Sequence, residues 1–504
     1  MDRTRPETTA LVEQGRFDLW RKRSGVVLSP LAFASVWWVD LPVSPEAHRL
    51  AAILAAVGVM WVTEVIPMAM TAFVGVATAV VLQVAPAQQA FAPFADPLIF
   101  LFIGTFILAR AIFVHGLDRR FALAILSLRW VGTSGPRLLA AYSGTAALIS
   151  MWISNTATVA MMFPIGLSIL HVLDRADPQR ARTSRFAAVL LLSCAFGASI
   201  GGLATPVGTP PNLIGLGFLR RSVGAEVPFF HWMALGVPLV VLLWAWMVFR
   251  FRTEARAAGA AFQAVAEHVA EERARLGRWT AGQRNTLIAF AVTVSLWVAP
   301  GVVALVVGQQ HPWYRWLVAV FPEGVVALLG AGLLFVLPTD WRRFRFTLNW
   351  EEAVQIDWWI VFLYGGGLAL GTMAFQTGLA EALGRALTSA LGIDSEAGLV
   401  AVSTACATLL SETTSNTGSA NMIVPVAIAF AQSTAVNPIL PALGATLGAS
   451  LGFMLPVSTP TNAIVYSSGR VPLITMIRYG LALDLAGVVV IVAVVTLLGP
   501  ILFV

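Results

Sequence analysis

Two short polar motifs interrupt the apolar stretches of this chain, and each occurs twice. SMWISNTATVAMMFP (residues 150–164) is matched by SETTSNTGSANMIVP (residues 411–425), with five residue types repeated at a constant offset of 261. PVGTPPN (residues 206–212) recurs as PVSTPTN (residues 456–462) at an offset of 250. A single Ser-Asn-Thr triplet is often a packing or capping group in a membrane helix. Two ordered motifs, both duplicated in register, indicate two related halves.

The residue types in these motifs suit the binding of ions and carboxylates. Pro210 and Pro460 prevent the backbone from closing into regular helix, which leaves carbonyl and N–H groups free. Such carbonyls, together with Ser and Asn oxygens, can hold a small hard cation, and N–H groups at helix N-termini can hold a carboxylate. No Lys, Arg or His falls within the four motifs. Bound cations would offset the cost of placing an anion there, so the motifs favour cation-coupled anion transport.

The elements that must position these motifs are membrane helices. The chain of 504 residues is 58% hydrophobic and only 12% charged, whereas ordinary soluble domains carry about 25% charged residues. Apolar segments lie at 24–39, 48–66, 68–84, 97–115, 187–204, 232–250, 285–307, 324–337, 357–374 and 476–503. Since a span needs about 20 residues, we predict an all-α polytopic membrane protein with about eleven spans.

Four segments are interrupted at the polar motifs, and one of them includes the apolar segment 187–204. Regions 137–170 and 397–431 each hold two short apolar arms around a Ser-Asn-Thr tip, which predicts two re-entrant hairpins. Regions 187–220 and 440–470 contain the proline motifs and are predicted to be broken helices. An odd number of spans between the halves would open the hairpins from opposite sides of the membrane, so that their tips meet near its midplane.

Charge in the loops predicts the orientation and the domain organisation. Arginines gather before the first span and in the loops at 171–186, 250–284 and 342–345, which places the N-terminus in the cytoplasm; Arg220 and Arg221 depart from this rule. We predict a cytoplasmic segment at 1–23, a first repeat half at 24–252, a cytoplasmic linker at 253–284 and a second half at 285–504. Residues 118–132 are typical of an interfacial amphipathic helix.

Other classes of protein fit the sequence less well. The net charge of +6 comes with no basic stripe and interleaved aromatics, so no nucleic-acid partner is expected. An enzyme would need a nucleophile with a base, paired carboxylates or a metal cluster, but the six histidines are scattered and the two cysteines lie far apart. A passive channel would need a ring of charged or carbonyl filter groups, and no such motif occurs.

Two acidic residues near membrane depth need separate interpretations. Glu64 precedes Pro67 in a short loop and is interpreted as a structural cap. Glu412 adjoins the second Ser-Asn-Thr motif. It either tunes the charge of an ion site or stabilises the hairpin tip, and the sequence leaves both interpretations open.

At these motifs the chain closely resembles the divalent anion/sodium symporter family, the dicarboxylate and citrate transporters with paired Ser-Asn-Thr motifs. The resemblance covers nearly the whole chain. It implies an inverted repeat with two opposed hairpins and two broken helices, a scaffold and a transport domain that moves like an elevator, and a homodimer in the bacterial inner (plasma) membrane. It also implies sodium-coupled import of C4-type dicarboxylates of the succinate, malate and fumarate class. Sodium-independent exchange, and transport of citrate or another divalent anion, stay open as alternatives.

The resemblance also implies roles for particular residues, with sodium ions as the co-transported partners and no organic cofactor. The first sodium site would consist of Ser150, Ser154, Asn155 and Gly208, and the second of Ser411, Ser415, Asn416 and Ser458. The substrate carboxylates would contact Ser154, Asn155, Thr156, Thr209, Pro210, Ser415, Asn416, Thr417, Thr459 and Pro460. The contrast between Gly208 and Ser458 is the clearest asymmetry between the two halves.

Overall fold

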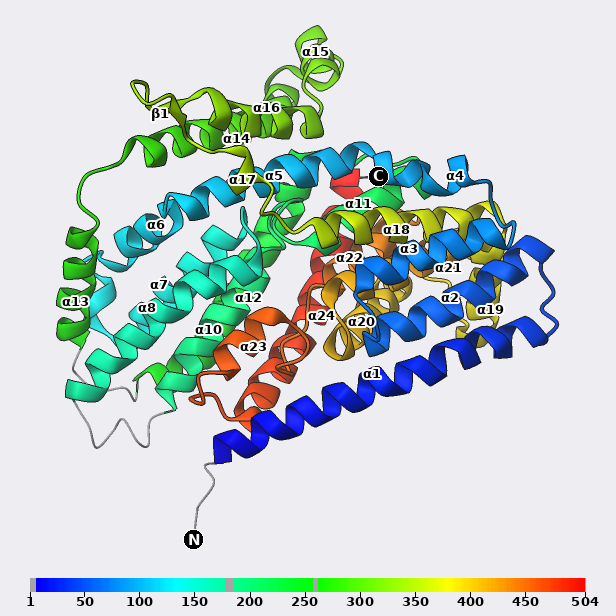
Figure 1. Cartoon of the computed structure of the whole chain (residues 1–504), viewed down its shortest axis with the longest axis horizontal. Helices are drawn as coiled ribbons and strands as arrows, with labels where there is room; N and C mark the ends of the chain where they lie inside the picture. Colours follow the sequence, from blue (N-terminus) through cyan, green and yellow to red (C-terminus); the bar gives the residue numbers. More distant parts are fainter. Residues whose placement is uncertain (1–5, 177–184, 257–261, 504) are drawn as a thin grey trace. The chain divides into compact units, whose positions relative to one another are not determined.

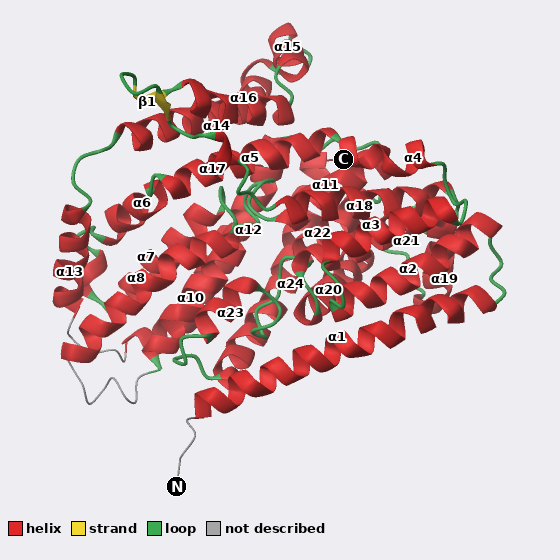
Figure 2. Ribbon diagram, viewed as in Figure 1, coloured by secondary structure: helices red, strands yellow, loops and turns green. Residues whose placement is uncertain are grey.

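The computed structural model describes residues 6–176, 185–256 and 262–503, and its regular structure is almost entirely helical (Figure 2). Within these ranges the only sheet is the two-stranded antiparallel pair of β1 (Pro338–Asp340) and β2 (Arg345–Phe346). The all-α class predicted from composition is therefore confirmed.

The chain forms two compact units, and each takes segments from both halves of the sequence. Unit 1 contains the residues up to Asp96 together with Ile214–Glu226 and Trp358–Ala449, and unit 2 contains Pro97–Leu213, Val227–Asp357 and the residues from Ser450 onward. The predicted boundaries at 24–252, 253–284 and 285–504 divide the sequence into repeat halves and a linker, not into compact units. The division into repeat halves stays a prediction.

Unit 1 is made of the first helices of the chain and the helices around the second hairpin (Figure 1). Its helices are α1 (Pro6–Trp38), α2 (Pro45–Thr63), α3 (Met68–Val81), α4 (Ala87–Phe91), η1 (Ala92–Ala95), η3 (Leu219–Val223), α18 (Trp358–Gln376), α19 (Leu379–Leu391), α20 (Glu396–Thr413), α21 (Asn416–Ser433) and α22 (Ile439–Gly448). Ser44 caps the start of helix α2, and Glu64 caps its end with a φ of 49°, in the left-handed region.

Glu64 has the structural role that the sequence indicated. Its carboxylate accepts a 2.7 Å hydrogen bond from Arg21 of α1, so the C-terminal end of α2 is tied to the first helix. That helix begins at Pro6, well before the expected apolar segment at 24–39, because the charged residues ahead of the segment continue the same helix.

Three successive glycines let α18 pack closely inside unit 1. A Cβ atom at Gly365, Gly366 or Gly367 would lie 2.5 Å from Phe94, 2.4 Å from Ala72 or 1.8 Å from Asn421, respectively. Only residues without side chains permit these approaches. The run GGGL is therefore a packing element that brings α18 against η1, α3 and α21.

Unit 2 contains the first hairpin and most of the long apolar helices. Its helices are α5 (Pro97–Val114), α6 (Leu117–Leu126), η2 (Val131–Thr133), α7 (Gly135–Ser150), α8 (Asn155–Ala176), α10 (Phe186–Gly201), α12 (Phe229–Arg256), α13 (Phe262–Arg275), α14 (Ala281–Val307), α15 (Pro312–Val320), α16 (Glu323–Val336), α17 (Trp350–Ala353), α23 (Pro460–Tyr466) and α24 (Leu473–Phe503). Helix α11 (Pro210–Phe218) crosses the boundary between the units at Leu213.

The apolar helices account for most of the predicted spans. In the described part of the chain, seven helices are long and apolar enough to cross a membrane, or up to nine if each of two bent pairs counts as one span. Three shorter apolar helices, α3, α10 and α22, add to these. The predicted number of eleven spans stays a prediction, because length and composition alone do not define whether a broken segment crosses the membrane.

Candidate ion and carboxylate site

Both Ser-Asn-Thr motifs form the break between two helical arms, as predicted, but α8 has 22 residues and is long enough to span a membrane, so it is longer than the short arm expected. Helix α7 ends at Ser150 and α8 begins at Asn155, while α20 ends at Thr413 and α21 begins at Asn416. The serine before each second arm caps it. The Ser154 hydroxyl accepts from the backbone N–H of Ala157 at 3.3 Å, and the Ser415 hydroxyl accepts from Gly418 at 3.1 Å. Ser and Asn are preferred at helix starts for this reason.

The paired serine and asparagine of each motif contact each other in the same way. Ser150 donates to Oδ1 of Asn155 at 2.7 Å, and Ser411 donates to Oδ1 of Asn416 at 2.8 Å. Both serines have no exposed surface. A buried serine therefore fixes the orientation of each amide oxygen, which a cation site requires.

The proline motifs break their helices as predicted. Helix α10 ends at Gly201 and α11 begins at Pro210, while α22 ends at Gly448 and α23 begins at Pro460. Proline is well suited to the first position of a helix, where its missing N–H has no partner to lose. The segment between each pair of helices exposes the backbone groups that a continuous helix would use internally.

One buried asparagine closes each break. The Asn212 side-chain amide donates to the carbonyls of Gly202 at 2.9 Å and Thr205 at 2.8 Å. Asn462 donates to the carbonyls of Gly452 and Leu455, both at 3.0 Å. Both asparagines have no exposed surface. The two breaks thus share one internal hydrogen-bond pattern at the 250-residue offset.

Each hairpin is also hydrogen-bonded to the break that follows it. In unit 2, the Thr205 hydroxyl donates to the carbonyl of Met151 at 2.5 Å. In unit 1, the Ser411 hydroxyl lies 2.8 Å from the carbonyl oxygen of Ala449 as well as 2.8 Å from Asn416 Oδ1, so these two acceptors share its single proton. A hairpin tip and the neighbouring break therefore form one local structure in both halves.

Two members of the first predicted sodium set, Asn155 and Gly208, lie close to Gly202 in unit 2. A Cβ atom at Gly202 would lie 2.6 Å from Asn155 Oδ1 and 3.2 Å from the carbonyl oxygen of Gly208. Two oxygens that face the same small space, with a buried hydroxyl bonded to one of them, are the donor set that hard cations prefer. Ser150, Ser154, Asn155 and Gly208 all belong to unit 2, and of these four the structure brings the oxygens of Asn155 and Gly208 close to Gly202.

The second predicted sodium set is divided between the units. Ser411, Ser415 and Asn416 lie in unit 1, whereas Ser458 lies in unit 2. Ser415 also donates to the sulfur of Met68 at 3.0 Å, a weak acceptor that leaves the serine oxygen available to other groups.

The predicted substrate residues are divided in the same manner. Unit 2 holds Ser154, Asn155, Thr156, Thr209, Pro210, Thr459 and Pro460, and unit 1 holds Ser415, Asn416 and Thr417. The two motif threonines differ, because Thr156 is exposed and Thr417 is only 5% exposed. The two hairpins are therefore related but not equivalent.

The tip of the second broken helix packs against the first-half helix α10. Thr459 caps α23 by accepting from the backbone N–H of Asn462 at 3.2 Å. Its hydroxyl lies 2.8 Å from that of Thr461, which in turn lies 3.4 Å from Ser199 of α10. This chain of hydroxyls within unit 2 joins residues from both halves of the sequence.

The motifs carry no cationic side chain, and Arg110, which lies outside them, contacts other groups. Arg110 of α5 hydrogen-bonds Gln355 and lies over the ring of Phe113. Across the described ranges, no group of three His, Cys, Asp or Glu side chains is placed to hold a metal ion. Glu412, adjacent to Ser411, is only 2% exposed.

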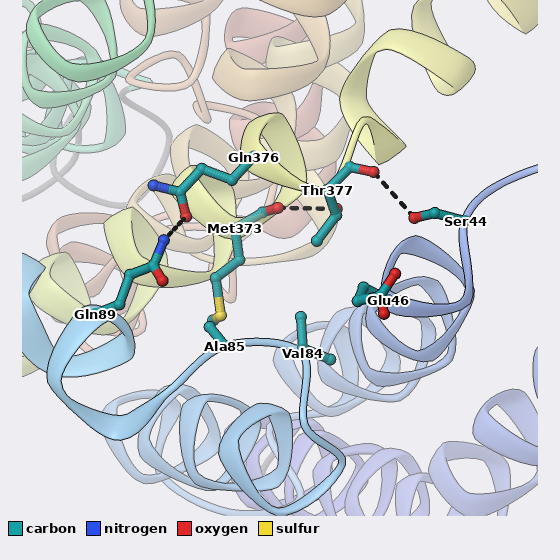
Figure 3. Close-up of a pocket in the computed structure, with 8 residues that line it drawn as sticks. All are labelled: Ser44, Glu46, Val84, Ala85, Gln89, Met373, Gln376 and Thr377. Atoms are coloured by element: carbon teal, nitrogen blue, oxygen red, sulfur yellow. Dashed lines mark hydrogen bonds between the residues drawn. The ribbon is translucent and has the colours of Figure 1, made fainter.

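A separate cavity of about 260 Å³ in unit 1 involves none of the predicted site residues (Figure 3). Its polar side chains largely satisfy one another, because Gln89 donates to Gln376 at 2.8 Å and Ser44 donates to the Thr377 carbonyl at 3.2 Å. This cavity therefore gives no reason to move the candidate site away from the motifs.

Gly202, Gly452 and Thr205 were not among the residues singled out by the sequence. Gly202 and Gly452 share the 250-residue offset of the proline motifs, so extending the internal alignment upstream would have found both. Asn212 and Asn462 were part of the motifs, but their roles as internal clamps depend on contacts that the sequence does not show.

Paired hairpins, paired broken helices and long apolar helices define this class of protein as a helical membrane transporter built on an internal repeat. The chain belongs to the family described as "Sodium:sulfate symporter transmembrane region", whose model matches residues 23–504. The family and the relatives below are transporters, which confirms both the resemblance and the expectation that this protein is not an enzyme.

Named relatives align with most of the chain. The sodium-dependent dicarboxylate transporter SdcS of Staphylococcus saprophyticus is 32% identical over 488 residues, which is 94% of this chain and 91% of that protein. Its counterpart in Staphylococcus aureus (strain bovine RF122 / ET3-1) is 31% identical over 491 residues, with 95% and 91% coverage.

Two solved structures show a similar fold. The YdaH transporter of Alcanivorax borkumensis aligns with a TM-score of 0.53 at 13% identity, covering 96% of this chain and 98% of that one. MtrF of Neisseria gonorrhoeae aligns with a TM-score of 0.52 at 13% identity, covering 95% and 96%. These likenesses concern the fold alone.

Proposed function

We propose that this protein is a secondary active transporter that imports C4-type dicarboxylates together with sodium ions. The observation that carries the proposal is the duplicated oxygen-rich break without any cationic side chain. A dianion needs positive charge inside a membrane, and the oriented oxygens of Asn155 and Asn416 suit a cation that can supply it. The relatives named as sodium-dependent dicarboxylate transporters support the same ion and the same substrate class.

We assign the ion and substrate roles that the resemblance to the family implies. The first sodium ion binds among Ser150, Ser154, Asn155 and Gly208, and the second among Ser411, Ser415, Asn416 and Ser458. Hydroxyl, amide and helix N-terminal N–H groups of the same motifs bind the two carboxylates. The protein works as a homodimer in the bacterial plasma membrane with a cytoplasmic N-terminus, and an elevator movement carries the site across.

Uptake into liposomes tests this proposal. Purified protein is reconstituted, and uptake of labelled succinate is compared under an inward sodium gradient, in potassium only, and in potassium with dicarboxylate inside. We expect concentrative uptake only with sodium. Uptake that needs internal dicarboxylate and ignores sodium would identify an exchanger, while citrate outcompeting succinate would overturn the C4 assignment.

A further inference from the structure

A second cavity lies in unit 2, apart from the sodium and substrate residues. It measures about 470 Å³ and is lined by α6, α8 and α13, which pack against one another (Figure 1). This volume is in the usual range for small-molecule sites. None of the residues assigned to sodium or substrate contributes to its wall.

One side of the cavity is apolar and faces outward. Phe113 is 50% exposed, and Ala160 and Pro164 of α8 are exposed as well. Helix α8 is long and apolar enough to span a membrane. Exposed apolar side chains on a membrane-spanning helix face lipid tails, so this side of the cavity is accessible to an acyl chain.

The other end of the cavity is polar and contains both signs of charge. Arg119 of α6 forms a 2.9 Å ion pair with Glu272 of α13. Nearby, the Ser168 hydroxyl lies 2.6 Å from Nε2 of His268. Helix α13 lies in the charged linker between the sequence halves, so the linker contributes Glu272 and His268 to the polar end of the cavity.

Asp118 leaves a buried charge without a complete set of partners. Its side chain is 3% exposed, and Oδ1 accepts from the backbone N–H of Arg119 at 2.8 Å. Among the residues that the structure describes, Oδ2 has no hydrogen-bond partner. Burial raises the pKa of Asp118 from 3.8 to about 6, so the group is mostly ionised at neutral pH. A buried carboxylate oxygen of this kind is stabilised by a cationic or hydrogen-bonding group placed beside it.

The balance of charges selects the headgroup. The cavity wall contributes two carboxylates, Asp118 and Glu272, and one guanidinium, Arg119, while Arg275 outside the wall also pairs with Glu272 at 2.6 Å, so the polar end carries no excess of positive charge. Pockets for anionic lipids such as cardiolipin are basic, so an anionic headgroup is disfavoured. A zwitterion with a primary ammonium and a phosphate matches both signs, and its acyl chain matches the apolar side.

We propose that this cavity binds an aminophospholipid of the phosphatidylethanolamine type. The ammonium group pairs with the Asp118 and Glu272 carboxylates. The phosphate accepts hydrogen bonds from Arg119 and from the Ser168–His268 pair, and an acyl chain lies along Phe113 and α8. The lipid thereby joins the linker helix α13 to α8, the second arm of the first hairpin.

Native mass spectrometry of the full-length protein tests the proposal. The protein in detergent is exposed to equal amounts of phosphatidylethanolamine and phosphatidylglycerol with matched acyl chains. We expect retention of the first lipid over the second by about tenfold, equivalent to 1.4 kcal/mol. Asp118→Asn and Glu272→Gln should each remove this selectivity, whereas Glu271→Gln, a change at an exposed neighbour outside the cavity, should keep it.

Two results would overturn the assignment. Equal retention of the two lipids by the unaltered protein, or preference for phosphatidylglycerol, would show that the cavity does not select an ammonium. Selectivity retained by Asp118→Asn or by Glu272→Gln, in protein that elutes as the unaltered form does, would show that these carboxylates do not bind it. Asp118→Asn keeps the acceptor for the Arg119 N–H, so this variant is expected to fold.

Discussion

At the scale of single residues, orientation of oxygen atoms is the central feature of the candidate site. Asn155 and Asn416 are partly buried, and in both cases a fully buried serine donates to the amide oxygen. A fixed oxygen binds a cation without first losing its own freedom, which strengthens binding. The missing side chain at Gly202 leaves space beside the Asn155 oxygen, because a Cβ there would lie 2.6 Å from that oxygen.

Substitution of Gly202 by alanine should therefore weaken sodium binding. The new Cβ would lie 2.6 Å from Asn155 Oδ1, too close for a real contact, and would displace that oxygen. We expect the sodium concentration for half-maximal succinate uptake to rise by about tenfold or more, a loss of at least ~1.4 kcal/mol. Gly332→Ala is the matched control, because a Cβ there meets nothing within 4 Å; unchanged sodium dependence in both variants would contradict the site.

Asp118 should make stability depend on pH. The pKa of Asp118 is about 6 in the folded protein and 3.8 in the unfolded chain. The folded protein therefore loses stability as Asp118 ionises, and this loss grows as the pH rises from about 4 to about 6. The full cost is about 3 kcal/mol. Asp118→Asn should remove it, raising the midpoint of thermal unfolding at pH 7.5 but not at pH 4 in lipid-free detergent. A variant whose midpoint follows the unaltered protein at both pH values would argue against the burial of this charge.

At the scale of elements, ion pairs anchor the second arm of each broken helix. After α11, Arg221 of η3 bonds Asp96 at 2.9 Å, and Tyr364 donates to the same carboxylate at 3.2 Å; all three lie in unit 1. After α23, Arg470 bonds Asp174 of α8 at 2.8 Å within unit 2. A broken helix lacks the continuous backbone ladder that would otherwise hold its second arm, and these pairs replace part of it.

Loss of the Asp96 charge should loosen the first of these anchors. Asp96 is 2% exposed, and breaking a buried pair leaves a charge without compensation. We expect Asp96→Asn to lower stability by about 2–3 kcal/mol, since Arg221 keeps some access to solvent. Thermal unfolding followed by size-exclusion chromatography measures the change. Glu226→Gln, which removes a 3.7 Å pair at a 74% exposed carboxylate, should change stability by no more than about 0.5 kcal/mol.

At the scale of the whole molecule, the compact units and the sequence halves do not coincide. The first hairpin belongs to unit 2 and the second to unit 1, while the tip of the second broken helix returns to unit 2. Neither unit alone carries both Ser-Asn-Thr motifs. A function that uses both motifs therefore requires the whole chain.

Single changes in either unit should accordingly abolish transport. Asn155→Ala removes the oriented oxygen of unit 2, and Asn416→Ala removes that of unit 1. We expect sodium-driven succinate uptake to fall at least about a hundredfold in each, a cost of ~2.7 kcal/mol, with elution as in the unaltered protein. Sodium binding should persist at the unaltered motif in each variant. Normal uptake by both variants would refute the site assignment.

Much of the fold and part of the site were predictable from particular residues. Helix α12 at Phe229–Arg256 and α24 at Leu473–Phe503 were expected because long apolar runs have no alternative in a membrane. The breaks at Pro210 and Pro460 were expected because proline removes a helix hydrogen bond and its ring disfavours the preceding helical turn. The full length of α1 was missed, since helix in a charged stretch leaves no apolar signal.

The sequence by itself determined the membrane class, the duplicated motifs and the absence of cationic side chains within them, because hydropathy, repeat offset and charge are properties of residue order. Only the tertiary structure decided that Asn212 and Asn462 clamp the breaks, that Gly202 faces the Asn155 oxygen, and that α6, α8 and α13 enclose a second, charged cavity. These contacts depend on how the chain folds back at the breaks and how its helices pack, and packing follows from shape and buried area, which residue order does not display.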